Sequence, residues 1–222
     1  MTDVFEAATP NTKQPAGHEE AFFRQTAQTQ SLIDERRIHK PNLDLLEYGC
    51  GWRGAQRVIL EGIKTFHDRL ALYDPHVEIR PPTCPNERIV DHAEIFGPGR
   101  RAFDIITLSY VLCCVSPKTG MGILQSLRAA QPQADMLIVD YTLNNRSQME
   151  VLDLLTSREE MKWREAMGEQ EFAETRRQFS PETLAEFVRS SGHNLQGGAI
   201  FLDEFGIRAA VVTHSSQNGR RV

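Results

Sequence analysis

The sequence predicts an α/β fold with a mostly parallel sheet and helices on both of its faces. Short apolar segments alternate with helical patterns four or five times between residues 43 and 141, which is typical of parallel strands joined by right-handed crossovers. The segment 103–109 is an almost continuous apolar run, as expected for a strand that is covered on both faces. Two further apolar segments, 199–202 and 207–213, are four residues apart and predict a hairpin at the end of the sheet.

The composition is that of one globular domain. The chain has 222 residues, of which 40% are hydrophobic and 25% are charged, and these are ordinary values for such a domain. The formal net charge of −5 disfavours a nucleic-acid partner, because phosphate binding usually needs a basic excess. No apolar run approaches the ~20 residues of a membrane span, and the first residues lack a secretory signal pattern. We therefore expect a cytoplasmic protein with no membrane or nucleic-acid partner, while the oligomeric state stays open.

The first part of the chain predicts a flexible segment followed by a helix. Residues 1–16 are polar and include two prolines, so we expect a flexible N-terminus and one domain over 17–222. A helix is expected from His18 to about Arg37. Its apolar positions are Ala21, Phe22, Ala27, Leu32 and Ile33.

Strands and helices then alternate. A helix after the first strand is expected to place Val58, Ile59, Ile63 and Phe66 on one side, and another helix is expected at 121–130. The predicted strands are 43–48, 70–73, 87–90, 103–109 and 136–141.

The alternation ends after the fifth predicted strand. Residues 146–178 are rich in Glu, Arg, Gln and Met and predict one or two amphipathic helices, an insertion that can form a helical cap together with the N-terminal helix. Ser180 and Pro181 are a favoured pair at a helix start, and that helix is expected to stop at Gly192.

The four cysteines predict no disulfide and no metal site. Cys50, Cys84, Cys113 and Cys114 contain no C-x-x-C pair, and Cys113 and Cys114 lie in an apolar segment. We expect all four to be reduced and structural. Metal-binding histidine patterns are also missing from the sequence, so no dedicated metal is predicted.

A glycine turn after the first strand is the most informative pattern. Gly49, Gly51 and Gly54 stand between a strand and a helix, where glycine lets backbone N–H groups and a helix N-terminus approach a ligand. Asp74 ends the next strand, 20 residues beyond Gly54, and an acid at this place can accept both hydroxyls of a ribose. Together they predict a nucleoside-binding site.

These residues resemble the first motif of the class I S-adenosylmethionine-dependent methyltransferases. Glu47 matches the acid two places before the first glycine of that motif, and residues 103–112 resemble the fourth-strand motif. The resemblance implies a Rossmann-like, seven-stranded, mostly parallel sheet with an antiparallel last strand, and S-adenosylmethionine as cofactor. It carries the cofactor-binding role onto Glu47, Tyr48, Gly49, Cys50, Gly51, Gly54, Asp74, Pro75, Asp91, His92 and Ser109.

The glycine turn departs from the family pattern in one place. The third glycine of the family usually stands two residues after the second, but Arg53 occupies that position here and glycine follows at Gly54. Trp52 and Arg53 can reach the methionine carboxylate or face solvent, and the sequence does not decide between these two alternatives.

Three residues beyond the fourth and fifth strands are the candidate catalytic residues. Tyr110, Tyr141 and Asn144 lie at the carboxyl edge of the predicted sheet, where such folds bind ligands. A tyrosine ring that faces a sulfonium stabilises it by ~0.5–2 kcal/mol. Each tyrosine can equally pack beneath the cap, and His76 and His92 are possible general bases.

The resemblance and the acidic balance together imply a methyltransferase that acts on a small molecule in a capped site. An alternative on the same fold is a cyclase, in which the amine of S-adenosylmethionine attacks its own γ-carbon and gives azetidine-2-carboxylate and methylthioadenosine. An NAD-dependent oxidoreductase is a less favoured alternative, because Glu47 and the final hairpin oppose a dinucleotide site. A non-catalytic binding protein that retains the fold is the other less favoured alternative.

Overall fold

The computed structural model describes residues 16–51, 54–82, 84–142 and 179–215. The helices among them are α1 (Ala16–Arg37), α2 (Ala55–Ile63), α3 (His92–Phe96), α4 (Pro117–Ala130) and α8 (Pro181–Ser190), with a 3-10 turn η1 (Leu112–Cys114). The strands are β1 (Asp44–Tyr48), β2 (Arg69–Tyr73), β3 (Glu87–Ile89), β4 (Ile105–Ser109), β5 (Asp135–Tyr141), β6 (Asn194–Leu195), β7 (Ile200–Phe201) and β8 (Arg208–His214).

One sheet holds all of these strands in the order β3-β2-β1-β4-β5-β8-β6, with β7 also paired to β8. The first five strands are parallel to one another, and β8 is antiparallel to β5. The predicted parallel sheet with a reversed last strand is therefore confirmed, as is the hairpin of β7 and β8. Eight strands replace the expected seven, because β6 and β7 pair with different ends of β8 and together form one interrupted outer strand.

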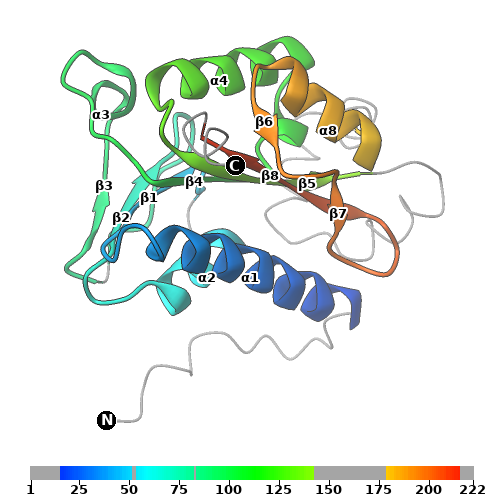
Figure 1. The fold of residues 1–222 in the computed structure, drawn as a ribbon, viewed down its shortest axis with the longest axis horizontal. Helices are drawn as coiled ribbons and strands as arrows, with labels where there is room; N and C mark the ends of the chain where they lie inside the picture. Colours follow the sequence, from blue (N-terminus) through cyan, green and yellow to red (C-terminus); the bar gives the residue numbers. More distant parts are fainter. Residues whose placement is uncertain (1–15, 52–53, 83, 143–178, 216–222) are drawn as a thin grey trace.

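Helices cover both faces of the sheet, with α4 and α8 on one side and α1 and α2 on the other (Figure 1). Alternate strand residues divide between two apolar clusters. Leu46 and Ile106 pack into the cluster that includes residues of α4 and α8, while Leu45 and Ile105 pack into the cluster that includes residues of α1 and α2. Because the helix α1 runs against the direction of the strands, its N-terminal half lies toward the carboxyl edge of the sheet (Figure 1).

The buried face of α1 differs from the expected one. Ala21, Leu32 and Ile33 are buried as expected, but Phe22 and Ala27 are exposed. Gln25 and Thr29 take their places on the buried face, where both side chains form hydrogen bonds. Polar groups occupy this face because it packs against polar side chains of the sheet edge and of α2.

The helix α2 is shorter than the apolar pattern suggested. It ends at Ile63, and Phe66 lies beyond it with 82% of its surface exposed. Val58 is also exposed, and the buried apolar positions of α2 are Ile59 and Leu60. The assignment of Phe66 and Val58 to an apolar helix face was therefore wrong.

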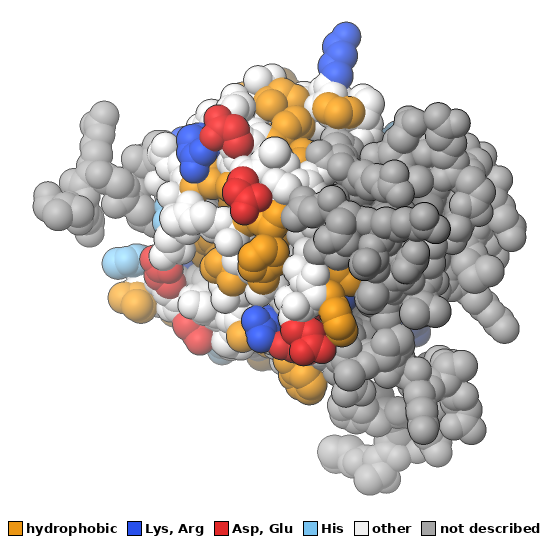
Figure 2. Space-filling view, turned by 90° about the vertical axis from the view of Figure 1, so that its right-hand side faces the viewer, with side chains coloured by type: hydrophobic (Ala, Val, Ile, Leu, Met, Phe, Trp, Pro, Cys, Tyr) orange, Lys and Arg blue, Asp and Glu red, His pale blue; other side chains and the backbone are white. Residues whose placement is uncertain are grey.

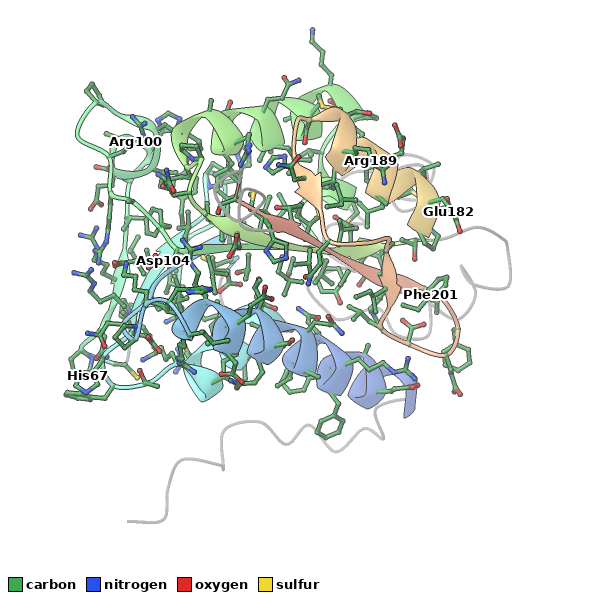
Figure 3. The ribbon with its side chains drawn as sticks, in the orientation of Figure 1. His67, Arg100, Asp104, Glu182, Arg189 and Phe201 are labelled. Atoms are coloured by element: carbon green, nitrogen blue, oxygen red, sulfur yellow. The ribbon has the colours of Figure 1, made fainter. Side chains whose placement is uncertain are left out.

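Aspartates mark the start of four parallel strands, at the amino edge of the sheet. Asp44 and Asp135 are the first residues of β1 and β5. Asp68 and Asp104 directly precede β2 and β4. Figure 3 labels Asp104 at this edge. A basic side chain forms an ion pair with each aspartate, and most of these basic residues lie at or just after the end of α1. The ion pairs are Arg37–Asp68, Lys40–Asp104, Arg36–Asp135, Arg69–Asp44 and Arg101–Asp44.

Candidate ligand site at the carboxyl edge of the sheet

The glycine turn leaves β1 in a conformation that favours glycine. Gly49 and Gly51 have φ angles of +75° and +58°, in the left-handed region. A Cβ atom at Gly49 would collide with the side chain of Val111. The backbone N–H of Gly49 donates to the carbonyl oxygen of Tyr73 at 2.7 Å, so the turn is fastened to the end of β2.

The helix α2 follows this loop directly. Gly54 is the N-cap residue of α2 and has no side chain that could cap the helix. The α2 first turn also contains no acidic residue. Since the first N–H groups of a helix have no partner within the helix, this end can bind an anionic or hydrogen-bond-accepting ligand group.

Asp74 lies beside the turn, as the spacing predicted. Its Oδ2 accepts a hydrogen bond from the Gly51 N–H at 2.9 Å, and its Oδ1 accepts from the N–H groups of His76 and Val77 at 2.9 and 3.0 Å. The carboxylate therefore organises the loop itself. Because each carboxylate oxygen offers about two acceptor sites, Oδ2 retains the capacity to accept one further hydroxyl in this conformation.

Glu47 is buried beneath the turn and is only 2% exposed. Burial raises its pKa well above the ordinary value, although the charge of Arg57 and a hydrogen bond from the Arg57 backbone N–H act in the opposite direction. The other carboxyl oxygen, Oε2, is buried without a hydrogen-bond partner. An unsatisfied buried carboxyl oxygen is costly, so its presence beside a glycine turn points to a polar or cationic ligand group as the missing partner.

Two other residues of the first strand and turn have side chains in the protein core. The ring of Tyr48 packs against those of Tyr73 and Phe96, with centroids 5.1 and 6.4 Å away. Burial raises the pKa of Tyr48 and of the Cys50 thiol to about 12 each. Side-chain contact of Tyr48 and Cys50 with a ligand is thus unfavourable in this conformation, while their backbone groups remain part of the turn.

The remaining predicted cofactor residues lie along the same edge. Pro75 follows Asp74 and is exposed. Asp91 caps α3 by accepting the Glu94 N–H at 2.8 Å, and the exposed His92 ring packs at 4.6 Å from that of Phe96. Asp91 therefore already has a structural function, in addition to the adenine-side position that the resemblance implies.

Tyr110 and Tyr141 are brought together at the ends of β4 and β5. Their ring centroids are 4.9 Å apart. Tyr110 has a φ of +59°, the one positive value for a residue other than glycine among the described residues. Such a backbone conformation costs of order 1–3 kcal/mol and is frequent at functional sites. Burial raises the pKa of Tyr110, so its phenol stays protonated at neutral pH.

The helix α1 contributes a polar network to this corner. The Gln25 amide donates to Gln56 Oε1 at 2.7 Å and to Ser109 Oγ at 3.3 Å, while the Tyr110 hydroxyl donates to Gln25 Oε1 at 3.4 Å. The Gln56 amide in turn donates to Thr29 at 3.2 Å. The network joins α1 and α2 to the end of β4, so α1 covers this part of the carboxyl edge.

Sequence reasoning missed a buried arginine at the same corner. Arg208 lies opposite Tyr141 in the β5–β8 pairing and is 2% exposed, with its guanidinium carbon 5.7 Å from the centre of the Tyr141 ring. Its Nη1 lies 3.6 Å from Asp203 Oδ2. The sequence signal was faint, since Arg208 is one charged residue at the start of an apolar strand. The signal for Gln25 and Thr29 was clearer, because both are in helical phase with Ala21 and Leu32.

Several predicted features lie outside the described residues. These are the candidate catalytic residue Asn144, the two loop residues Trp52 and Arg53, the predicted helical cap at 146–178, and the expected flexible segment up to residue 15. Within the described part, no group of three or more His, Cys, Asp or Glu side chains is placed to hold a metal ion. No helix in that part is long and apolar enough to cross a bilayer.

Two surface grooves lie away from the glycine turn. One runs between α8 and β7, where Glu182, Arg189 and Phe201 are among its lining residues (Figure 3). The other lies near Arg100 and the end of α4, toward the amino edge. On the face shown in Figure 2, hydrophobic side chains of the described region gather in the middle, with acidic and basic side chains around them. None of the predicted site residues lines either groove.

Solved structures with the same fold are numerous. The mitomycin 7-O-methyltransferase is similar at 14% identity and a TM-score of 0.51, over 87% of this chain and 56% of the other. An O-methyltransferase of neocarzinostatin biosynthesis, solved with S-adenosylmethionine and 2-hydroxy-5-methyl naphthoic acid, is similar at 13% identity and a TM-score of 0.51, over 86% and 57% of the two chains. LepI, solved with S-adenosylmethionine, is similar at 14% identity and a TM-score of 0.54, over 83% of this chain and 46% of the LepI chain.

These likenesses show the fold at low sequence identity. The chain spans about half the length of the similar structures. No protein-family model matches the sequence, and no curated protein sequence is significantly similar to it. The predicted fold is confirmed as that of the class I methyltransferases, and the ligand and reaction have to be argued from the site.

Proposed function

We propose that this chain, which has the class I methyltransferase fold, binds S-adenosylmethionine and transfers its methyl group to a small molecule. The observation that carries the proposal is the unsatisfied, buried Oε2 of Glu47, directly behind a glycine turn and a helix start that has glycine at its N-cap. A protonated amine is the group of S-adenosylmethionine that can complete the hydrogen bonding of this oxygen. The residues of the site therefore fit the cofactor.

Each part of the cofactor has a matching group along the carboxyl edge. The methionyl amine would be held by Glu47, either directly or through a water, and the methionyl carboxylate by backbone N–H groups at the start of α2. A ribose hydroxyl would donate to Oδ2 of Asp74. The adenine would lie along Pro75, Asp91 and His92, whose exposed positions leave room for a ring.

When bound, the cofactor supplies a methyl group on a sulfonium, which is already an activated leaving group. The protein then has to orient an acceptor and to exclude water. Tyr110 and Tyr141 present two aromatic rings at the ends of β4 and β5, close to Ser109. Their faces can stabilise a neighbouring cation. Because the raised pKa keeps Tyr110 protonated, we assign it a positioning and shielding role rather than that of a general base.

A small acceptor is favoured by the cover over this corner and by the net charge. Gln25 fastens α1 to Ser109 and Tyr110, which narrows access to the ends of the strands. The chain has a net charge of −5, whereas enzymes that act on nucleic acid usually offer a basic surface. The neocarzinostatin enzyme of the same fold was solved with a small aromatic acid, which supports the same substrate size here.

Titration calorimetry with S-adenosylmethionine tests cofactor binding. Asp74→Ala removes the ribose acceptor and the loop contacts, so its affinity should fall by tenfold or more, which is at least about 1.4 kcal/mol. Glu186→Ala, on the exposed face of α8, is the matched control and should bind like the parent protein. Equal affinity of Asp74→Ala and the parent would show that the ribose assignment is wrong.

The reaction itself is tested with methyl-labelled cofactor and a panel of metabolites, oligonucleotides and peptides. Labelled small-molecule products would support the proposal, and labelled nucleic acid alone would contradict the substrate class. A parallel incubation with the cofactor and no acceptor distinguishes the cyclase alternative, since that reaction would release azetidine-2-carboxylate together with methylthioadenosine, above the amounts in an incubation without protein.

A further inference from the structure

Cys113 and Cys114 place two thiols side by side next to Tyr110. The two Sγ atoms are 3.8 Å apart within the turn η1. Both sulfurs lie within hydrogen-bond distance of the Tyr110 carbonyl oxygen, at 3.4 and 3.3 Å. The side chains of adjacent residues therefore point to the same side of the chain, instead of to opposite sides as they would in a strand.

The two cysteines differ in their access to solvent. Cys113 is 1% exposed, while Cys114 is partly exposed. All four cysteines of the chain fall within the described residues, and all are in the thiol form. The pair thus combines a reachable sulfur with a buried sulfur in contact with it, which is the arrangement of an attacking and a resolving thiol.

We propose that Cys113 and Cys114 are a redox modification site that a hydroperoxide converts reversibly into a disulfide between these two neighbours. The Cys114 thiolate attacks the peroxide O–O bond, which gives a sulfenic acid on Cys114 and releases one water from hydrogen peroxide. The Cys113 thiol then displaces the sulfenic hydroxyl as a second water, and the S–S bond forms. Two thiols lose two hydrogens, and one peroxide is reduced to two waters.

The adjacency of the two residues explains why the bond would be reversible. Consecutive Cα atoms are about 3.8 Å apart, below the usual Cα separation of about 4.4–6.8 Å in disulfides. Strain of this kind makes a disulfide easier to reduce. The bond would therefore be a transient one that an ordinary thiol reductant opens again, and not a permanent structural link.

Oxidation would remove hydrogen bonds to the backbone carbonyl oxygen of Tyr110. The reduced thiols are hydrogen-bond donors toward the Tyr110 carbonyl, and a disulfide has no S–H group to donate. Tyr110 already has the unfavourable φ of +59°, so loss of these contacts acts on a strained residue. The redox state of the pair is in this way linked to the candidate catalytic corner.

Peptide mass spectrometry tests the proposal on the intact protein. Trypsin is expected to release residues 102–118 as one peptide, which contains Cys113 and Cys114 and no other cysteine. The native protein is treated with hydrogen peroxide, quenched, alkylated under denaturing conditions and digested. We expect this peptide to lose two hydrogens and to escape alkylation, and to regain two alkylated thiols after prior treatment with dithiothreitol.

Single substitutions provide the controls. Cys113→Ser and Cys114→Ser should both abolish the two-hydrogen loss, while Cys84→Ser, a partly exposed cysteine elsewhere, should leave it unchanged. Two alkylated thiols in the peroxide-treated peptide would overturn the proposal. A sulfinic acid on Cys114 with an intact Cys113 thiol, or a disulfide between two chains, would overturn it as well. None of these readouts depends on the cofactor.

Discussion

Glu47 shows at the scale of one residue how stability and the proposed ligand binding conflict. A carboxyl group in this place is buried, and one of its oxygens has no hydrogen-bond partner. Burial raises its pKa well above the ordinary value. Folding therefore favours the protonated form, and ionisation of Glu47 lowers the stability of the ligand-free protein as the pH rises above the unfolded pKa of about 4.3.

The substitution Glu47→Gln separates these two effects. The amide keeps the shape of the side chain and removes the ionisation, so the stability of this variant should change less than that of the parent between pH 5 and pH 7. Its affinity for S-adenosylmethionine should fall about tenfold, or about 1.4 kcal/mol, because the charge that faces the amine is gone. Thermal unfolding at both pH values and calorimetry measure the two effects; an unchanged affinity would argue against Glu47 as the amine partner.

The candidate site residues that the sequence predicts are those whose placement depends on local chain order. Glycines in a turn and an acid at the end of the next strand are determined by spacing, and the structure places Gly51 and Asp74 in hydrogen-bond contact. Gln25 and Arg208 reach the site only through tertiary packing. Helical phase places Gln25 on the buried face of α1, but no local pattern reports its contacts with Ser109 and Tyr110 or those of Arg208 with Tyr141.

At the scale of elements, the turn between β1 and α2 requires glycine at position 49. Gly49→Ala adds a Cβ that collides with Val111 and places alanine at a φ of +75°. We expect a loss of about 1–3 kcal/mol in the free energy of unfolding, together with weaker cofactor binding. Gly62→Ala, within α2 and with open space around its Cβ, should instead be neutral or stabilising by up to about 1 kcal/mol. Urea unfolding of both variants measures the contrast, and equal effects would contradict it.

The amide of Gln25 contributes to the attachment of α1. Gln25→Ala leaves the buried Gln56 and the partly buried Ser109 without that hydrogen-bond partner, and we expect a loss of about 1–3 kcal/mol in the free energy of unfolding. Gln30→Ala removes only an exposed hydrogen bond to Asp34 on the same helix and should have little effect. Chemical denaturation compares the two variants. If both were equally mild, α1 would be held by its apolar contacts and by the ion pairs of Arg36 and Arg37.

Helix boundaries were predictable where a capping signal was used. Ser180 and Pro181 correctly predicted the start of α8, and the same pair, Ser116 and Pro117, starts α4 four residues before the helix expected from residue 121. The buried face of α1 was harder to predict, because its hydrogen-bonded polar residues interrupt the apolar period. The alternation of strands and helices was predictable because the central strands β1, β4 and β5 carry buried apolar residues on both faces.

At the scale of the whole molecule, the two edges of the sheet differ. The aspartates at the amino edge are compensated by basic side chains, whereas at the carboxyl edge Oε2 of the buried Glu47 has no hydrogen-bond partner. Burial acts to raise the pKa of Asp44, but hydrogen bonds and charges of Arg69 and Arg101 outweigh it and lower the pKa. For Asp68, hydrogen bonds from Leu43, Thr65 and Arg37 likewise outweigh burial and lower the pKa.

These lowered pKa values predict an acid-sensitive fold. The ionised carboxylates of Asp44 and Asp68 stabilise the fold at a pH above the unfolded aspartate pKa of about 3.9. This stabilisation is lost as the pH falls through their lower pKa values in the folded protein. Asp68→Asn should cost about 1–3 kcal/mol at pH 7 and should flatten the decline below pH 4. Asp34→Asn, which removes an exposed partner of the same Arg37, should cost little. Unfolding curves from pH 2 to 7 test this, and identical curves for the two variants would contradict it.

The interrupted outer strand of β6 and β7 has a consequence for how the protein behaves in a crowded solution. The strands β6 and β7 have two residues each, and Gly197 lies between them with a φ of +79°. This border of the sheet therefore has no long straight row of backbone amide groups. Another polypeptide can therefore form only a few backbone hydrogen bonds there. The short strands alone disfavour fibrous aggregation through this border, and no charged side chain is needed to block it.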